Sequence, residues 1–369
     1  MMAKPFAEPS FLRTIGLVLL AIVALFAVDM FLAGLERVET RAEATRLFQQ
    51  GRVLMQRGDN TEAIKRIKDA IAIERGNRDY RRTLAQAQLA SGNTADAETT
   101  LSELLQSDSS DSLASLIMGR VLVKEGRFAE AITYYRRAIY GHWNEDEAGN
   151  RLRVRFELID LLAQRNSKEE LLAELLPAQE EAPRDLKTQT RLGRLFLLAG
   201  SPSRAGDTFR GILHAAPANA DAHAGLGEAE FAQGNYRAAD RDFRTALRLA
   251  PDDQATRQRL DLCNELLMMD PTYRGLGPAE RYHRSLKLVE LTLDETGQCV
   301  GRNPSPELQG LLDKAGKALK THVNAAHESE VSESNLDLAE QLWQARRKEC
   351  KSPPATDSPL ALVLARLAQ

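Results

Sequence analysis

The sequence predicts an all-α protein: a stack of repeated helix pairs, with one apolar helix before it and a helical extension after it. Three observations carry this prediction. Alanine, leucine, arginine and glutamate are abundant, and these residues lose little side-chain freedom on a helix. An apolar stretch near the N-terminus is long enough for a membrane helix. Glycine and alanine recur at an interval of 34 residues, which indicates a repeat architecture.

The composition excludes several classes of protein. The chain has 369 residues and a net charge of −3, with acidic and basic residues mixed along its length. A nucleic-acid-binding protein needs a concentrated basic face, which this pattern does not provide. Three cysteines are too few for a fold framed by disulfides.

The sequence also contains no recognisable set of catalytic or metal-binding residues. No motif for nucleophilic catalysis or phosphate binding is present. His322 and His327 are five residues apart, so they do not share one face of a helix as metal-binding histidines do. We therefore expect no enzyme activity, no metal, no cofactor and no small-molecule substrate.

Residues 14–35 predict a transmembrane helix. As a helix, 22 residues span about 33 Å, enough to cross the hydrocarbon core of a bilayer. The uninterrupted apolar run, Ile15 to Val28, is shorter, and Asp29 follows it. Two alternatives therefore stay open, a cleaved signal peptide and a buried helix. A small-residue cleavage site of the A-x-A type is missing, which favours an uncleaved anchor, with Asp29 at an interface or against a partner span.

The orientation of this anchor follows less directly from charge. Lys4 and Arg13 precede the apolar stretch, and three arginines follow it, so a count of basic residues does not decide the orientation. Long domains are translocated largely regardless of charge. With a short tail before the anchor, we expect a single-pass protein of the bacterial inner membrane whose main body lies in the periplasm.

The repeat has three marks in each unit. A glycine recurs at positions 58, 92 and 126, and again at 200 and 234. An alanine follows each of these glycines by five residues, and a glycine or alanine precedes it by seven. Small residues let two helices approach closely, and glycine permits the backbone angles of a tight turn. The pattern predicts pairs of helices, each pair joined at a glycine.

The clearest unit is AHAGLGEAEFAQGNYRAADRDFRTALRLAP, Ala222 to Pro251. It resembles the tetratricopeptide repeat (TPR) family. In that motif a small residue marks the crossing of helix A and helix B, a glycine makes the turn, a small residue begins the packed face of helix B, and a proline ends the unit. The resemblance implies a right-handed superhelical solenoid.

The spacing predicts six units between residues 44 and 253. Gly126 and Gly200 are 74 residues apart, which is two periods plus six. We therefore expect a degenerate fourth unit, with its turn near Asn166 and its end near Pro183. The extra residues are expected in GHWNEDEAGN, Gly141 to Asn150.

The resemblance also implies where a partner binds. In TPR proteins helix A of each unit lines a concave groove, and the residue after the small one near the crossing points into it. In the six units this position holds Arg52, Gln86, Arg120, Asp160, Arg194 and Glu228. Nearby groove positions hold Phe48, Leu116, Phe156 and Phe231.

Three arginines among six groove positions suit a carboxylate or an acidic segment, because guanidinium forms forked hydrogen bonds. The alternative is that they are solvated residues on a helix face. The family's clamp for C-terminal carboxylates requires lysine and asparagine at set groove positions, and this chain does not have that set. We therefore expect no clamp of that kind.

The region after the repeats predicts further helices. Residues 254–269 read as a capping helix, which a solenoid needs to cover its last apolar face. A break at 270–278 precedes an amphipathic helix over 279–298. Further helices are expected to begin at Ser305, before a proline, and at Ser334, where Asp337 completes a capping-box-like start. The last ten residues are apolar enough to dock back or to bind a partner.

The cysteines are expected to differ in role. Cys299 precedes the Ser305 helix and Cys350 ends the Ser334 helix, so an antiparallel hairpin of these two helices would bring both to one end. We expect a disulfide there, which fits an oxidising compartment; the alternative is two free thiols. Cys263 is expected to be a small buried packing residue.

The sequence thus divides the chain into seven parts. They are a tail (1–13), the anchor (14–35), a linker (36–43), six TPR units (44–253), a cap (254–269), a helical region (270–351), and a linker with a terminal helix (352–369). We expect a scaffold that binds other proteins in envelope assembly or secretion. One alternative is a non-catalytic subunit of a membrane enzyme complex, in which Asp29 meets other spans. Another is a docking platform that faces the cytoplasm.

Overall fold

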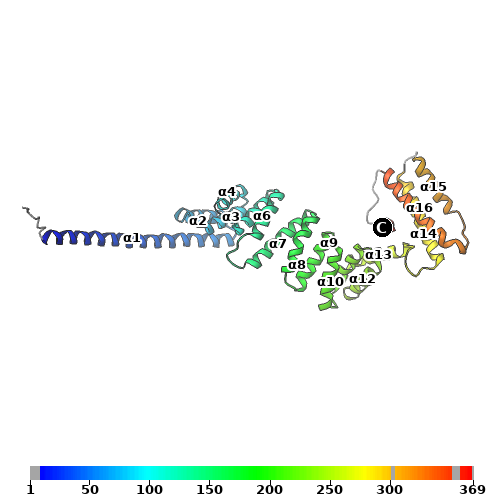
Figure 1. The fold of residues 1–369 in the computed structure, drawn as a ribbon, viewed down its shortest axis with the longest axis horizontal. Helices are drawn as coiled ribbons and strands as arrows, with labels where there is room; N and C mark the ends of the chain where they lie inside the picture. The colour runs from blue at the N-terminus through cyan, green and yellow to red at the C-terminus, as the bar shows by residue number, and fades with distance from the viewer. Residues whose placement is uncertain (1–8, 301–303, 351–357, 368–369) are drawn as a thin grey trace, which may run out of the picture. The chain divides into compact units, whose positions relative to one another are not determined.

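The computed structural model describes residues 9–300, 304–350 and 358–367. These residues form stacked α-helices, with an isolated bridge between Asp111 and His142, so the predicted all-α fold is confirmed (Figure 1). The chain divides into two units, residues 1–161 and 162–369, and each is described by itself.

The first helix of the first unit, α1 (Pro9–Gln56), is continuous over 48 residues. It includes the apolar stretch, the segment 36–43 and helix A of the first repeat. The segment 36–43, predicted as a linker, is helical, because no glycine or proline between Leu35 and Gln50 interrupts a series of good helix formers. Residues 9–13 of the predicted tail are also helical, and residues 1–8 lie outside the described part.

Among the described residues, α1 is the helix long and apolar enough to cross a membrane, judged by length and composition. This segment begins at Leu17, its most apolar window has a mean hydropathy of 2.6, and none of that window is buried in the protein. Asp29 is exposed on this part of α1.

The rest of the first unit continues this series of helices, and α1 to α6 pack against one another in sequence order. The helices are α2 (Asn60–Ile73), α3 (Arg78–Ser91), α4 (Thr94–Ser107), α5 (Ser112–Lys124), α6 (Phe128–Tyr140) and α7 (Glu147–Gln164). Odd-numbered helices are the A helices of the repeats and even-numbered helices are the B helices.

The glycine marks lie at the turns between helix A and helix B. Gly58, Gly92 and Gly126 have φ values of 86°, 87° and 77°, in the left-handed region that favours glycine. In the degenerate unit Asn166 takes this place with a φ of 54°. Asparagine is among the non-glycine residues that tolerate this conformation, which explains how a unit without the glycine keeps the turn.

The small residue before each turn lies where the two helices touch. A Cβ atom added at Gly227 would lie 2.6 Å from the Phe243 ring of the paired helix B. Gly51, Gly119 and Gly193 likewise lie against a large side chain of the paired helix B, which is Ile67, Tyr135 and Phe209 in turn. A small residue at this crossing leaves the space that the side chain of helix B fills.

The second unit continues the alternation and then departs from it. Its repeat helices are α8 (Lys168–Glu181), α9 (Leu186–Leu198), α10 (Pro202–Ala215), α11 (Ala220–Ala232), α12 (Tyr236–Leu249) and the cap α13 (Gln254–Met269). The helices that follow are α14 (Pro278–Cys299), α15 (Pro306–Ala318), η1 (Ala325–His327), α16 (Glu328–Glu349) and α17 (Pro359–Leu367).

These C-terminal helices share one hydrophobic core with the end of the repeats. Leu266 of α13, Val289 of α14, Leu342 of α16 and Leu364 of α17 are each at most 1% exposed and belong to the same cluster. The final apolar segment therefore docks back onto its own chain. Arg366 of α17 pairs there with Asp270.

One predicted helix start in this region is wrong. Ser305 caps α15, and its hydroxyl accepts a hydrogen bond from the backbone N–H of Leu308. Ser334, in contrast, lies inside α16, which begins at Glu328. The residues before Ser334 include Glu328 and Glu330, which stabilise the positive end of a helix and extend it toward the N-terminus.

Cys299 at the end of α14 and Cys350 after α16 are joined by a disulfide in the structure, with a Cα–Cα distance of 5.7 Å. The hairpin that brings them together is formed by α14 and α16, not by the helix that begins at Ser305. Cys263 is a free, fully buried cysteine whose thiol donates to the carbonyl of Tyr236 at 3.0 Å.

Candidate partner-binding surfaces

Three of the apolar residues predicted to line the groove are core residues. Phe48 is 9% exposed and stacks on Tyr80, with ring centroids 4.4 Å apart. Leu116 is fully buried, and Phe231 is 7% exposed. They hold neighbouring helices together and are not available to a partner. Phe156 is half-buried on α7.

Arg120, predicted to face a partner, is bound by the protein itself. Its Nε and Nη2 atoms donate to the two carboxylate oxygens of Glu157 at 2.9 and 2.6 Å. Arg120 is on α5 and Glu157 on α7, which are consecutive A helices. The hydrogen bond to Glu157 raises the pKa of Arg120 above its ordinary value. A free cation at this groove position is therefore replaced by an internal ion pair.

The second unit repeats this arrangement with different residues. Glu228 of α11 accepts two hydrogen bonds of 2.6 Å from Arg259 of α13, whose guanidinium lies 4.3 Å from the Phe231 ring centroid. The predicted groove position of one A helix is again neutralised by the next A helix. Ion pairs along the A helices are a feature that the repeat spacing alone did not reveal.

Arg52 and Arg194 keep more freedom. Arg52 is exposed on α1, with its guanidinium 6.0 Å from the Phe48 ring centroid. Arg194 of α9 approaches Asp221 of α11 at 3.6 Å, but the two side chains are 63% and 71% exposed. An exposed pair at this distance contributes little and can be replaced by another partner.

Arg194 borders a hollow of about 550 Å³ between α9 and α11. Leu186 and Leu195 contribute apolar surface, and Lys187 with Arg194 contributes positive charge. The remaining lining residues are Thr190, Arg191, Asn219 and Asp221. Of the predicted groove residues, Arg194 lies at a hollow beside a second A helix.

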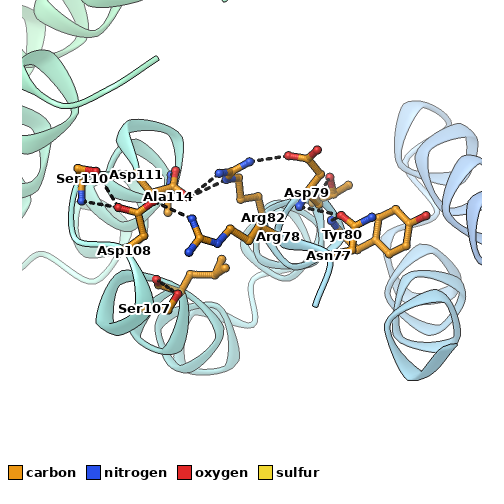
Figure 2. Close-up of polar contacts among 12 residues, drawn as sticks. Asn77, Arg78, Asp79, Tyr80, Arg82, Ser107, Asp108, Ser110, Asp111 and Ala114 are labelled. Atoms are coloured by element: carbon orange, nitrogen blue, oxygen red, sulfur yellow. Dashed lines mark hydrogen bonds and ion pairs between the residues drawn. The ribbon is translucent and has the colours of Figure 1, made fainter. Parts of the chain in front are cut away.

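The first unit has a polar cleft that the sequence did not predict, of about 690 Å³. Arg78 at the start of α3 pairs with Asp108 at 2.7 Å, and Arg82 donates to Asp111 at 2.8 Å (Figure 2). Hydrogen bonds from Ser110 to Asp108 lower the pKa of that carboxyl. Arg78 is thus paired within its own repeat, at the end of α4, and Arg82 is paired with the residue that caps α5 of the next repeat.

The far wall of this cleft is the inserted segment before α7. The His142 backbone N–H donates to the Ser110 carbonyl at 3.1 Å, and the Trp143 indole donates to the Ala138 carbonyl at 2.9 Å. Asp111 also caps α5 by accepting from the Ala114 N–H at 3.0 Å. The insertion is thus tied to the third repeat, and its polar contacts serve the packing of the stack.

The described residues contain no group of three or more histidine, cysteine or acidic side chains that could hold a metal ion.

Models of the tetratricopeptide repeat match residues 54–121, 114–140 and 220–253. These segments are tetratricopeptide repeats. The matched segments hold the glycine turns at positions 58, 92 and 234 and the helix crossings described above. TPR domains mediate protein–protein interactions by binding other polypeptides.

Solved TPR structures resemble parts of this chain. YrrB, described as a TPR protein with an unusual peptide-binding site, is 19% identical, with a TM-score of 0.42, and the match covers 52% of this chain and 96% of YrrB. The C-terminal part of a TPR protein from Cytophaga hutchinsonii is 16% identical, with a TM-score of 0.45 and coverage of 66% and 95%. PilW, a type IV pilus biogenesis factor, is 17% identical, with a TM-score of 0.39 and coverage of 59% and 98%. No curated protein sequence matches the chain.

Proposed function

We propose that this TPR protein is a non-catalytic scaffold, anchored in the bacterial inner membrane by α1, that binds segments of partner proteins on its periplasmic side during envelope assembly or secretion. The observation that carries the proposal is the hollow between α9 and α11, which joins two A helices and combines apolar surface with the weakly paired Arg194.

The compartment is supported by two features of different kinds. Residues 17–32 of the apolar part of α1 are exposed, which is unfavourable in water and favourable in a bilayer. The Cys299–Cys350 pair forms a disulfide, and disulfides persist in oxidising compartments such as the periplasm. A docking platform in the cytoplasm would not keep this bond.

The chemistry of the hollow favours a partner segment with acidic residues. Lys187 and Arg194 are about two turns apart and therefore lie on the same side of α9, Lys187 in its first turn and Arg194 in its third. Asp221 contacts Arg194 at 3.6 Å, and a partner carboxylate at shorter distance would replace it with a stronger, charge-assisted hydrogen bond. Leu186 and Leu195 provide the apolar area that gives such a contact affinity.

A photoreactive amino acid in place of Thr190, which lines the hollow, tests this proposal in intact membranes. We expect a crosslink to a partner that Arg194→Glu abolishes and that Arg204→Glu, an exposed position on α10, leaves unchanged. A crosslink of equal strength in both variants would show that the hollow does not select by charge. A C-terminal reporter that is active only outside the cytoplasm tests the orientation, and an inactive reporter would contradict it.

A second candidate function, a non-catalytic subunit of a membrane enzyme complex, is favoured by Asp29. A carboxylate exposed on an apolar helix is costly in a bilayer unless another span pairs with it. Asp29→Ala should leave a periplasmic scaffold assembled with its partners but release the chain from a complex held by its membrane span. Co-purification of wild type and variant in mild detergent distinguishes the two functions.

A further inference from the structure

Four arginines lie in one row on the outer face of α12, which is helix B of the last repeat. The buried residues of this helix are Tyr236, Ala239, Phe243 and Ala246. The arginines are Arg237, Arg241, Arg244 and Arg248, spaced by four, three and four residues. With 3.6 residues per turn, this spacing places them in one row on the side away from the buried residues, and all four are exposed. We call this row the arginine face.

The charge on the arginine face is only partly neutralised. Arg244 is paired with Asp240, whose two oxygens both lie 2.9 Å from its Nε. In the part of the chain that the structure describes, no carboxylate pairs with Arg237, Arg241 or Arg248. Three cations therefore stand in one row without a carboxylate partner among the described residues.

The guanidinium groups at the two ends of the row are held in place without being neutralised. Arg237 lies over the Tyr273 ring, 3.6 Å from its centroid, and donates to the Arg274 carbonyl. Arg248 donates to the Thr245 hydroxyl at 3.0 Å. Contacts of this kind restrict the side chain and leave its charge available, which lowers the entropy cost of binding an anion.

An apolar hollow accompanies the arginine face. It has a volume of about 630 Å³ between α12 and α13, with Arg241, Arg244 and Arg248 along its edge and Leu247 and Leu260 in its wall. Leu260 is 9% exposed and Leu247 is half-buried, so these side chains line the hollow without projecting from it.

Toward the other end, Arg237 and Arg241 border a second cleft of about 570 Å³, which Arg274 and Arg366 also line. Its acidic residues are already paired. Glu230 accepts from Arg210 at 3.0 Å, and Asp270, 2% exposed, is bound by Arg366. Positive charge therefore extends from one hollow to the next along α12.

We propose that the arginine face of α12 is a second docking surface, which binds an acidic segment of a partner protein with one or two leucine-like residues. Its carboxylates pair with Arg237, Arg241 and Arg248 through forked hydrogen bonds, and its apolar side chain enters the hollow beside Leu247 and Leu260. A membrane surface fits less well, because the leucines of this face are recessed and cannot enter a bilayer. The surface lies on a B helix, so it adds to the hollow between α9 and α11 and does not replace it.

Fluorescence anisotropy with the full-length chain in a non-ionic detergent tests the proposal. The probe is a labelled peptide, GDEELDELEG, and its neutral analogue is GNQQLNQLQG. We expect the acidic peptide to bind and the analogue not to bind. The double variant R241E/R248E should weaken binding by about tenfold or more, which corresponds to about 1.4 kcal/mol. Both positions are exposed, and circular dichroism with the thermal midpoint checks that the variant folds.

Two further variants serve as controls. One is expected to strengthen binding, and the other makes the same charge change away from the arginine face. Asp240→Asn frees Arg244 and should strengthen binding by about twofold, because it removes the acid on the edge of the face. Arg204→Glu, exposed on helix B of the preceding repeat, should leave binding unchanged. An equal loss with Arg204→Glu would show that only net charge matters and would overturn the proposal.

The remaining outcomes separate this surface from the others. Loss of peptide binding in Arg194→Glu with R241E/R248E unchanged would overturn the arginine face and leave the hollow between α9 and α11 standing. Binding to phosphatidylserine vesicles that R241E/R248E abolishes, without binding of the peptide, would assign the face to a membrane and also overturn the proposal.

Discussion

Arg120 of α5 and Glu157 of α7 join two consecutive A helices through two parallel hydrogen bonds, of 2.9 and 2.6 Å. Their side chains are 36% and 30% exposed, so solvent screens the pair in part. The pair links α5 directly to α7. At this groove position the arginine therefore pairs with a neighbouring helix of its own chain and not with a partner protein.

Arg120→Ala should lower the free energy of unfolding of the first unit by about 1 kcal/mol, because the partly exposed, forked pair is lost. The measurement is the urea midpoint followed by circular dichroism. The double variant R120A/E157A should be no less stable than R120A, since Glu157 then has nothing to lose. Independent, additive losses from the two single variants would show that the pair does not couple the helices.

Gly227→Ala should destabilise the second unit by about 1 to 3 kcal/mol, because the added methyl group meets the Phe243 ring and must displace it. Gly211→Ala is the matched control. Nothing lies within 4 Å of a Cβ atom at Gly211, in the interior of α10, so this change should stabilise by about 0.5 to 1 kcal/mol. Thermal midpoints of the two variants should move in opposite directions, and a stabilised Gly227→Ala would contradict the close crossing.

The Cys299–Cys350 disulfide closes a loop with a sequence separation of 51 residues. In the chain-entropy description a loop of this length stabilises by about 4 kcal/mol, and measured values commonly fall between about 2 and 5 kcal/mol. Cys299→Ser should therefore lower the unfolding midpoint of the C-terminal helices and remove the mobility difference between reducing and non-reducing electrophoresis. Cys263→Ser should keep that difference, and wild type without any difference would show that the thiols are free.

Burial raises the pKa of the Cys263 thiol to about 12, from an ordinary value of 9.0. The folded state keeps the thiol protonated while the unfolded chain ionises it at a lower pH. This contribution to stability is present below about pH 9 and is lost as pH rises toward 12. Between pH 9 and 10.5 the urea midpoint of wild type should fall more steeply than that of Cys263→Ala, and parallel curves would contradict the shift. Thiol labelling of the folded protein at pH 8 should be slow and should accelerate in urea.

The repeats could be predicted from the sequence because their marks are local and steric. Gly58, Gly92 and Gly126 adopt left-handed turns that other residues rarely adopt, so their spacing reports the fold directly. Asn166 kept the turn of the unit without a glycine for the same reason. Such constraints depend on one residue and its immediate neighbours.

Features that depend on distant pairing were harder to predict. The sequence does not show that Glu157 reaches Arg120, or that Phe48 is covered by Tyr80, because each contact depends on how two repeats stack. In the C-terminal region α16 pairs mainly with α14, and no repeat spacing is present there to indicate it. The spacing of the four arginines of α12 does not by itself indicate a binding surface, because the hollows beside them are formed with α13 and the segments after it.

Because α1 is unbroken, the number of residues between the apolar segment and the first repeat determines the orientation of that repeat about the helix axis. Each residue added between Leu35 and Ala44 would advance the first repeat by 1.5 Å and turn it by about 100° relative to the apolar segment. One inserted alanine would thus turn the surface of the first repeat to a different side of the helix axis. Seven inserted residues would return it to within about 20° of its original orientation. The length of α1 between the apolar segment and the first repeat therefore determines the direction in which the repeats present a bound partner.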